Sequence, residues 1–284
     1  YVVAIILSKA LGLKSNTPPS SNSSTSVAET SQYAETHQKC GDAEKTEKAK
    51  PFEKFKNNND EKKSVTDDTD SSIDKKVSEK NKQTEVTQTS NGTDLINIAN
   101  PNGQGVSYND FDSFNVGQNG VIFNNSKQTG TSQTGGIVEK NTNLNNTANL
   151  VIGEVTGKDI SKINGIIEMF GAQADLIIAN SNGIVVNGAG FINIPKVMLT
   201  TGKYDKTTGK ILAENGTVEI SGNGIDVTKT NYFTILSRII KLYGDIYGGT
   251  SEVNLIAGQN IYDTVNRSYE STSSAIGGAP SFAI

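Results

Sequence analysis

Asp175-Leu-Ile-Ile178 and Gly183-Ile-Val-Val186 are two short apolar runs, and Ala179-Asn-Ser-Asn182 lies between them. Short runs rich in β-branched residues and bounded by Asn and Gly are typical of β-strands. Asn and Gly tolerate a positive φ, and an Asn side chain can also hydrogen-bond to nearby backbone groups. The stretch therefore predicts a strand, a sharp corner and a second strand.

The same unit recurs from residue 91 to the end of the chain. Residues 91–284 hold 26 of the 28 Gly residues, together with 25 Asn residues and neither Cys nor His. Eight further runs are expected to be strands: Leu95–Ile98, Gly120–Phe123, Asn149–Ile152, Gly165–Glu168, Lys196–Leu199, Thr217–Ile220, Gly224–Val227 and Val253–Ile256. A helical period is present at most over Phe233–Leu242. The region is therefore predicted to be all-β.

Two all-β architectures are compatible with this pattern. Val218-Glu-Ile-Ser221 and Ile225-Asp-Val227 alternate, which places one face of each strand inward and the other in water. A solenoid repeats the same corner on each coil, so turn-forming residues recur along its sequence. No clean repeat period is present, so on pattern alone a β-sandwich stays open beside the solenoid.

The first third of the chain has a different composition. Residues 14–90 contain 13 Lys and 14 Asp or Glu, but only 13 apolar residues and one Gly. Burying so little apolar surface cannot offset a backbone ordering cost of about 1–2 kcal/mol per residue, so we expect a disordered charged linker. Residues 1–13 form an apolar segment that is too short to span a membrane. We interpret it as a signal-peptide remnant, with a stray apolar segment as the alternative.

The composition also excludes several classes of function. The chain has one Cys, one His and a formal net charge of −4. A single Cys excludes an internal disulfide and a multi-Cys zinc site, and the negative charge gives no support for binding to nucleic acid. His37 and Cys40 both lie in the linker, which offers no fixed geometry for a metal or redox role. We therefore expect no enzyme, no metal and no cofactor.

Over residues 91–284 the chain resembles the two-partner secretion domain (haemagglutination activity domain) of filamentous haemagglutinins and related large exoproteins. The resemblance opens with Leu95–Asn102 and Gly105–Ser126, and it is strongest over Ala174-Asp-Leu-Ile-Ile-Ala-Asn-Ser-Asn-Gly-Ile184. Further landmarks follow in the family's order: Ala148–Gly157, Ile163–Glu168, Gly190–Asn193, Leu199–Gly202, Val253–Asn260 and Ser274–Gly278. The ordered string of motifs is far more specific than any one of them.

This resemblance implies a right-handed parallel β-helix with extra-helical β elements, truncated at its C-terminus in this chain. It also implies a role as the N-terminal secretion-recognition module of a large adhesin-like exoprotein. Such a module is recognised in the periplasm by the POTRA domains of an outer-membrane partner transporter and contributes no catalysis. The exoprotein would be secreted or displayed on the surface of a Gram-negative bacterium, and any host-cell receptor would be bound by the region downstream.

Two family motifs, NPNL and NPNGI, are tied to recognition by the transporter. They map onto Asn141-Thr-Asn-Leu144 and Asn180-Ser-Asn-Gly-Ile184, with Thr142 and Ser181 in place of the family's Pro. Asn141, Asn143, Leu144, Asn180, Asn182, Gly183 and Ile184 are therefore the candidate recognition residues. Their alternative role is to build tight turns, with Asn stacked beneath another coil, and the two roles are compatible. The Cys pair that some members carry after the second motif is replaced by Val186 and Ala189.

A second class of function stays open, a stand-alone β-helix that binds or processes host glycans. Glu154, Asp175 and Glu219 could suggest a lyase or glycosidase. Such sites need clustered carboxylates, often with Ca²⁺ or basic partners, and the sequence shows no motif of this kind. The long charged linker is a departure from the family, in which the domain closely follows the signal peptide.

Overall fold

The computed structural model describes residues 84–271 and 281–283. All regular secondary structure in these residues is β-structure, arranged as 24 strands. None of the described residues belongs to a helix long and apolar enough to cross a membrane. Residues 1–83, with the apolar segment 1–13, most of the charged linker, His37 and Cys40, lie outside the described part of the chain.

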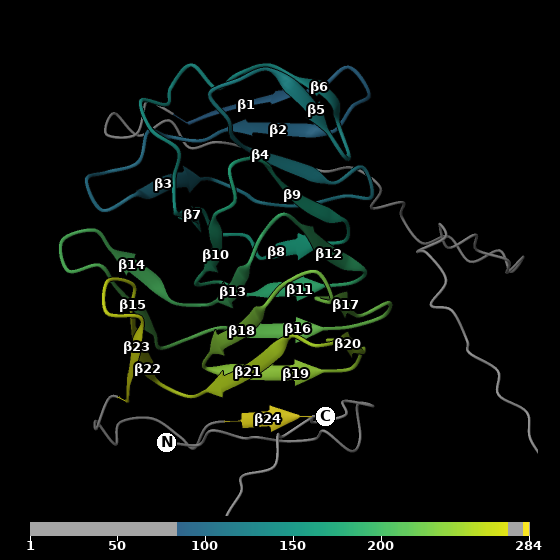
Figure 1. Ribbon diagram of the computed structural model, residues 1–284. Helices are drawn as coiled ribbons and strands as arrows, with labels where there is room; N and C mark the ends of the chain where they lie inside the picture. Colours follow the sequence, from purple (N-terminus) through teal and green to yellow (C-terminus); the bar gives the residue numbers. More distant parts are fainter. Residues whose placement is uncertain (1–83, 272–280, 284) are drawn as a thin grey trace, which may run out of the picture. The chain divides into compact units, whose positions relative to one another are not determined.

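Three sheets, in which the strands of successive coils stack in parallel, form the body of the molecule (Figure 1). The seven-stranded sheet contains, in spatial order, β1 (Glu85–Gln88), β2 (Asp94–Asn97), β4 (Val121–Asn125), β9 (Ile166–Gly171), β12 (Ala189–Ile192), β17 (Ile225–Asp226) and β20 (Ile246–Tyr247). The six-stranded sheet contains β3 (Val106–Phe111), β7 (Leu150–Val155), β10 (Asp175–Asn180), β13 (Lys196–Thr200), β18 (Tyr232–Ser237) and β21 (Glu252–Ala257). The five-stranded sheet contains β8 (Ser161–Ile163), β11 (Ile184–Val186), β16 (Thr217–Ile220), β19 (Ile239–Leu242) and β24 (Ser281–Ala283).

Successive coils visit these sheets in the same order. β9, β10 and β11 form one coil with one strand in each sheet, and β17, β18 and β19 form another. Each strand pairs in parallel with the equivalent strand of the next coil, so that Ile177 lies opposite Ile152 on one side and Met198 on the other. This arrangement confirms the predicted β-helix and excludes the β-sandwich.

The ten apolar runs all fall on strands, but the segment Phe233–Leu242 does not form a helix. It forms β18 and β19, with a corner between them at Arg238. Phe233 and Ile235 point into the core while Leu236 points outward, which is the alternation of a strand. Parallel neighbours on both sides of β18 supply its backbone hydrogen bonds, and these pairings override the weak helical period.

The folded domain starts earlier than the expected boundary at residue 91. β1 lies within the segment predicted to be disordered, so that boundary is wrong. β1 pairs antiparallel with β2, with Val86 opposite Ile96, and Val86 packs against the main core. The local composition gives no sign of this strand because its partner supplies both the hydrogen bonds and the apolar contact.

The main core fills the inside of the helix. Alternate strand residues such as Leu176 and Ile178 point into it and are buried. Near the N-terminal end, three adjacent rings continue this core: Phe111 and Phe114 are tilted to each other with centroids 5.5 Å apart, and Phe114 stacks on Phe123 at 6.0 Å. Burying one such side chain contributes about 1.5–3 kcal/mol, so the core of each coil holds the next in place.

A second apolar layer lies outside the six-stranded sheet. There a four-stranded antiparallel sheet covers the outward side chains of Ile152, Ile177, Met198 and Leu236. Its strands are β14 (Lys203–Asp205), β15 (Lys210–Ala213), β22 (Asn260–Asp263) and β23 (Ser268–Ser271). The two hairpins are inserted into different coils and meet where β15 pairs with β22. This sheet is one of the expected extra-helical elements.

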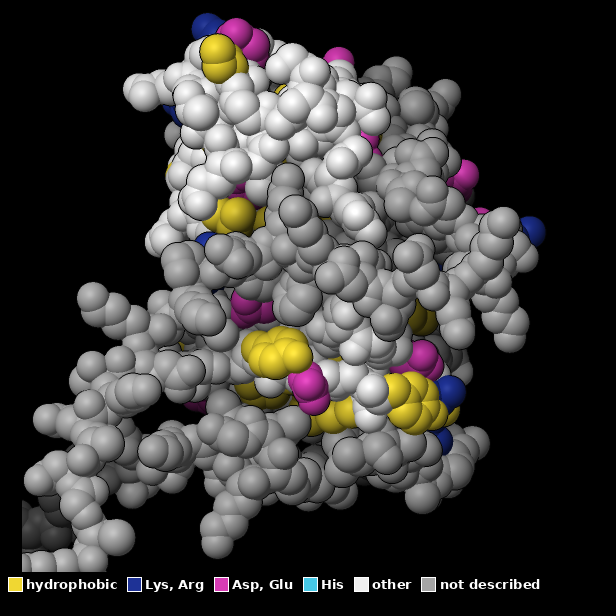
Figure 2. All heavy atoms as spheres, turned by 90° about the vertical axis from the view of Figure 1, so that its right-hand side faces the viewer, with side chains coloured by type: hydrophobic (Ala, Val, Ile, Leu, Met, Phe, Trp, Pro, Cys, Tyr) yellow, Lys and Arg dark blue, Asp and Glu magenta, His cyan; other side chains and the backbone are white. Residues whose placement is uncertain are grey.

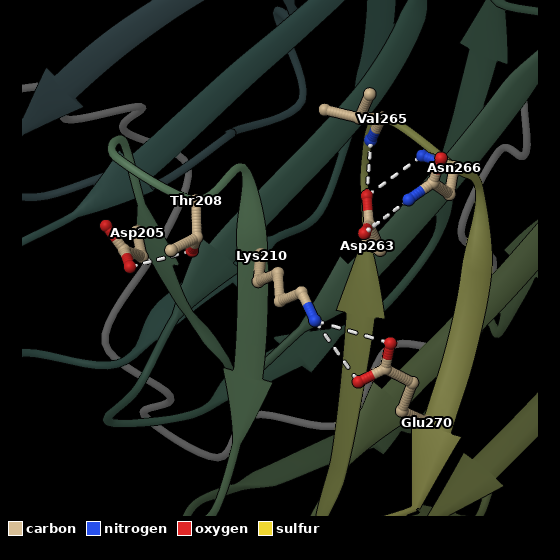
Figure 3. A network of polar contacts seen from close by, with 7 residues as sticks. All are labelled: Asp205, Thr208, Lys210, Asp263, Val265, Asn266 and Glu270. Atoms are coloured by element: carbon tan, nitrogen blue, oxygen red, sulfur yellow. Dashed lines mark hydrogen bonds and ion pairs between the residues drawn. The ribbon is translucent and has the colours of Figure 1, made fainter.

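Polar contacts fix the two hairpins of this outer sheet (Figure 3). Asp205 accepts hydrogen bonds from the Thr207 amide and the Thr208 hydroxyl at 2.8 and 2.7 Å. At the other turn, Asp263 accepts hydrogen bonds from the amides of Val265 and Asn266 at 2.8 and 2.9 Å. These bonds, chiefly from the Thr208 hydroxyl and the Asn266 amide respectively, lower the pKa of both carboxyls. Between the turns, the Lys210 ammonium lies 3.2 Å from the Glu270 carboxylate.

A further hairpin, β5 (Gly130–Ser132) and β6 (Gly136–Val138), covers part of the outer face of the seven-stranded sheet. Val138 packs there on Leu95, Ile122 and Phe170. The buried Glu168 carboxylate accepts hydrogen bonds from the amide and the hydroxyl of Thr134 at 2.9 and 2.7 Å. The hairpin is therefore held to the sheet by both apolar and polar contacts.

Glu154 of β7 joins the outer sheet to the β-helix. Its buried carboxylate accepts a hydrogen bond from the Tyr108 hydroxyl at 2.6 Å and another from the Tyr204 amide at 3.1 Å. Tyr108 lies on β3 and Tyr204 on β14, so one side chain connects three strands. Burial is the main cause that raises the pKa of Glu154, because it disfavours the charged carboxylate.

We predict that Glu154→Gln changes how stability depends on pH. With a raised pKa in the folded state, Glu154 contributes most to stability below the unfolded pKa, and that contribution falls as pH rises through the folded pKa. The free energy of unfolding of the wild type, minus that of Glu154→Gln, should therefore fall as pH rises above about 4.5. Urea titrations between pH 4 and pH 8 measure it, with the exposed Glu214→Gln as the control for loss of a charge. A difference that grows with pH would contradict the raised pKa.

Candidate functional site

The first candidate corner, Asn141–Leu144, lies between β6 and β7. The side-chain oxygen of Asn141 accepts a hydrogen bond from the backbone amide of Asn143 at 3.0 Å. The backbone amide of Leu144 donates to the backbone carbonyl of Asn141 at 3.3 Å. The Asn141 side-chain NH₂ donates to the backbone carbonyls of Ile98 and Asn124, both at 2.9 Å. Asn141 thereby closes its own turn and ties it to strand β4 of its own coil and to the coil before it.

The second candidate corner, Asn180–Ile184, joins β10 to β11 and has the same geometry. The Asn180 side-chain oxygen accepts from the Asn182 amide at 2.9 Å, and the Gly183 amide donates to the Asn180 backbone carbonyl at 3.1 Å. The Asn180 NH₂ donates to the Asp159 carbonyl and the Ser161 hydroxyl, both at 2.9 Å. Each motif therefore begins with an Asn that bonds its own turn and the coil before it.

Position 183 requires glycine. Its φ is 134°, a conformation that residues with a side chain rarely adopt. A Cβ there would also lie 3.1 Å from the Thr217 carbonyl oxygen on the next coil. Gly183 lets the second corner lie close beneath its neighbour, and the buried Ile184 then starts β11.

Burial divides the candidate residues into two groups. Asn141 and Asn180 are 2% and 0% exposed, and Leu144, Gly183 and Ile184 are buried as well. Asn182 is exposed and Asn143 is intermediate. Asn141 and Asn180 therefore build the turns. The exposed surface of each corner comes from the residues that directly follow them. The two corners lie at different bends of the helix, because one follows the seven-stranded sheet and the other joins the six-stranded to the five-stranded sheet.

Three further Asn residues do the same work and were missed in the sequence. Asn125 accepts from the Ala148 amide at 2.8 Å and donates to the carbonyls of Ala148 and Ala172 at 2.9 and 3.0 Å. Asn109 accepts from the Ala99 amide at 2.9 Å, and Asn124 donates to the Glu139 carbonyl at 2.9 Å. All three are buried. For Asn124 and Asn125 the available signal is the Asn-Asn pair directly after an apolar run, whereas Asn109 has no such signal.

The acidic residues considered for glycan chemistry do not meet at one site. Glu154 and Asp175 lie on β7 and β10 of the six-stranded sheet, while Glu219 lies on β16 of the five-stranded sheet. Within residues 84–271 and 281–283, no three His, Cys, Asp or Glu side chains are placed to hold a metal ion. On the face shown in Figure 2, acidic and basic side chains are scattered among polar ones, and hydrophobic side chains form small separate groups.

Comparison with known proteins gives consistent results for sequence and structure. The model of the family described as "TPS secretion domain" matches residues 71–283. Filamentous hemagglutinin of Bordetella pertussis is 40% identical over 191 residues, which is 65% of this chain and 5% of that protein. A tRNA nuclease CdiA of Yersinia mollaretii is 39% identical over 180 residues, which is 61% of this chain and 6% of that protein. The chain therefore spans about one twentieth of the length of these relatives.

A solved structure has the same fold. The crystal structure of the filamentous hemagglutinin secretion domain superimposes with a TM-score of 0.65 at 38% sequence identity, over 71% of this chain and 72% of that one. At this identity the likeness extends beyond a shared architecture.

We predict that Asn180→Ala destabilises the domain. The substitution removes the acceptor for the Asn182 amide and the donor to the Asp159 carbonyl, and a buried polar group without a partner costs about 1–3 kcal/mol. The free energy of unfolding should fall by about that amount in urea titrations. The exposed Asn215→Ala is the matched control, and its change should stay within about 0.5 kcal/mol. Equal effects of the two substitutions would contradict the structural role of Asn180.

We predict that Ser181→Pro stabilises the same corner. Ser181 takes the first central position of the turn, has a negative φ and follows a residue in a strand, all of which suit Pro. Pro restricts the unfolded chain, so the free energy of unfolding should rise by about 0.4–1 kcal/mol. Thr142→Pro makes the matched change at the first corner. Loss of stability in both variants would show that the turns differ from the geometry described.

Proposed function

This chain belongs to the TPS secretion domain family, and from that membership we propose that it is the secretion-recognition module of a large filamentous-haemagglutinin-like exoprotein. The observation that carries the proposal is the family match over residues 71–283, supported by the likeness to a solved secretion domain at 38% identity. In this proposal the activity of the whole exoprotein, whether adhesion or toxin delivery, belongs to regions beyond the part that matches.

The partner in this proposal is an outer-membrane transporter, whose periplasmic POTRA domains bind the module and start its passage outward. The exoprotein is then secreted or displayed on the cell surface of a Gram-negative bacterium. Two of the relatives, filamentous hemagglutinin and CdiA, are proteins of Bordetella and Yersinia. Their similarity to this chain covers 5% and 6% of their lengths, which supports a role shared by exoproteins with different activities.

The Asn corners contribute to recognition in two ways in this proposal. Asn141 and Asn180 are buried, so they act by holding each corner in shape. The exposed positions, Thr142 in the first corner and Asn182 in the second, are the ones that a partner contacts. The Asn182 side chain already donates to the Gly157 carbonyl at 3.0 Å, which sets its direction at the surface.

Strand pairing supplies the remaining affinity. While the exoprotein is incompletely folded, its strand edges are open, and they pair with strand edges of the POTRA domains by β-augmentation. Each coil that forms outside the cell then buries the strand edges of the coil before it. Because folding proceeds from coil to coil, growth at the surface draws the chain outward.

We predict that export depends on the transporter. The full chain, fused behind a known signal peptide, should reach the medium of cells that carry a cognate two-partner transporter and stay in the periplasm of cells that lack it. Immunoblots of medium and periplasm measure the ratio. Retention of folded protein in the periplasm despite the transporter would contradict the proposed function.

The same assay separates the two groups of corner residues. Asn182→Ala should reduce export while leaving the free energy of unfolding nearly unchanged, and Asn180→Ala should reduce both. The exposed Asn215→Ala is again the control, with wild-type export expected. Normal export of Asn180→Ala and Asn182→Ala together would remove this corner from the recognition model.

A further inference from the structure

On the outer face of the six-stranded sheet, one row of side chains lies beside the border of the four-stranded sheet and is not covered by it. Lys196 lies opposite Tyr232, and Tyr232 lies opposite Glu252. Asp175 continues the row, since it precedes Leu176, which pairs with Val197. In the next outward row, Ile177 and Met198 are covered by the outer sheet. A row of polar side chains thus follows the helix axis along the border of the outer sheet.

This row forms one wall of a groove with a volume of about 210 Å³. The opposite wall comes from Tyr262, Arg267 and Tyr269 of the β22–β23 hairpin. The rings of Tyr262 and Tyr269 lie 4.9 Å apart and are tilted by 38°, and the Arg267 guanidinium lies 3.7 Å from the Asp175 carboxylate. Segments that are far apart in the sequence therefore form the groove, which explains why the sequence shows no motif for it.

The charges of the groove balance one another. Asp175 and Glu252 are acidic, and Lys196 and Arg267 are basic. The Lys196 ammonium lies 5.0 Å from the centre of the Tyr232 ring, a cation–π contact that orients this ring at the groove. A groove with no excess charge has little attraction for a free anion or cation. A neutral ligand with many hydrogen-bonding groups therefore suits this groove better than a charged one.

We propose that this groove binds a short, neutral, linear oligosaccharide. A tyrosine ring offers an apolar face to the C–H face of a sugar and a hydroxyl at its edge. Carboxylates accept hydrogen bonds from sugar hydroxyls, while Lys196, Arg267 and the Asn254 amide can donate them. Tyr232 is 42% exposed, so part of its side chain is accessible to a sugar beside the Lys196 ammonium.

The geometry favours a linear sugar chain over an extended peptide. Parallel strands lie about 4.8 Å apart, so the row from Asp175 to Glu252 spans about 14 Å. That length suits a few pyranose rings laid along the helix axis, each near one coil. An extended peptide gains its affinity from free backbone groups at a sheet edge. Here the strands β10, β13 and β18 are paired on both sides, and they offer only side chains.

The test is a titration of the full chain with four tetrasaccharides, followed by saturation-transfer NMR. Chitotetraose represents the sugars of bacterial cell walls, lacto-N-neotetraose those of host surfaces, and cellotetraose a plain neutral glucan. A heparin tetrasaccharide is the anionic comparison. We expect saturable binding of at least one neutral tetrasaccharide, and the one that binds identifies the source. Tyr232→Ala should weaken that binding by about tenfold, a loss of about 1.4 kcal/mol.

Tyr243→Ala is the matched control, because Tyr243 is 62% exposed and does not line the groove. It should bind as tightly as the wild type, and Lys196→Gln serves as a second groove variant in case Tyr232→Ala is unstable. The proposal is wrong if no neutral tetrasaccharide saturates, if only heparin binds, or if Tyr243→Ala weakens binding as much as the groove variants. Export of Tyr232→Ala should remain normal, so failure here is distinguishable from failure of the proposed function.

Discussion

The constraint on which the structure depends is that each coil must turn its corners without leaving backbone groups unpaired. In the strands, the parallel neighbours satisfy these groups, but at a corner the ladder is interrupted. Asn141 and Asn180 solve this problem in the same way, with one side-chain oxygen for their own turn and one NH₂ for an earlier coil. Asn125 and Asn109 bridge earlier and later segments in the same manner. Among the described residues, every buried side-chain nitrogen or oxygen has a hydrogen-bond partner.

The outward faces of the helix impose the second requirement. Successive side chains of a strand point alternately into the solenoid and out of it, so an apolar residue that points outward must be covered by another element. The outer four-stranded sheet and the β5–β6 hairpin provide such covers, over Ile177 and Met198 in one case and over Ile122 in the other. Because β15 and β22 come from different coils, the cover also joins those coils to each other. The same sheet ends beside a polar row and so creates a groove.

The sequence predicts those features whose cause is local. The ten apolar runs and the corner after Asp175–Ile178 are recognisable because each is set by a few adjacent residues, whereas the corner at Asn141–Leu144 was assigned through the family resemblance. β1 was missed because its partner β2 stabilises it, and β18 and β19 showed a weak helical period that their parallel neighbours override. Asn109 is a polar residue in a strand, and only the fold shows that it points into the protein. The groove depends on side chains more than ninety residues apart, such as Asp175 and Tyr269, which no local pattern can bring together.

The antiparallel strand β1 caps one edge of the seven-stranded sheet. Parallel coils stack on one another because each presents the pattern of hydrogen bonds that the next requires, and two copies of a β-helix could in principle stack end to end in the same way. β1 runs against the direction of β2 and occupies its outer edge. In the seven-stranded sheet, another molecule would have to displace this strand before it could continue the parallel ladder. In this sheet β1 thus stands in the way of head-to-tail stacking of a second copy on β2.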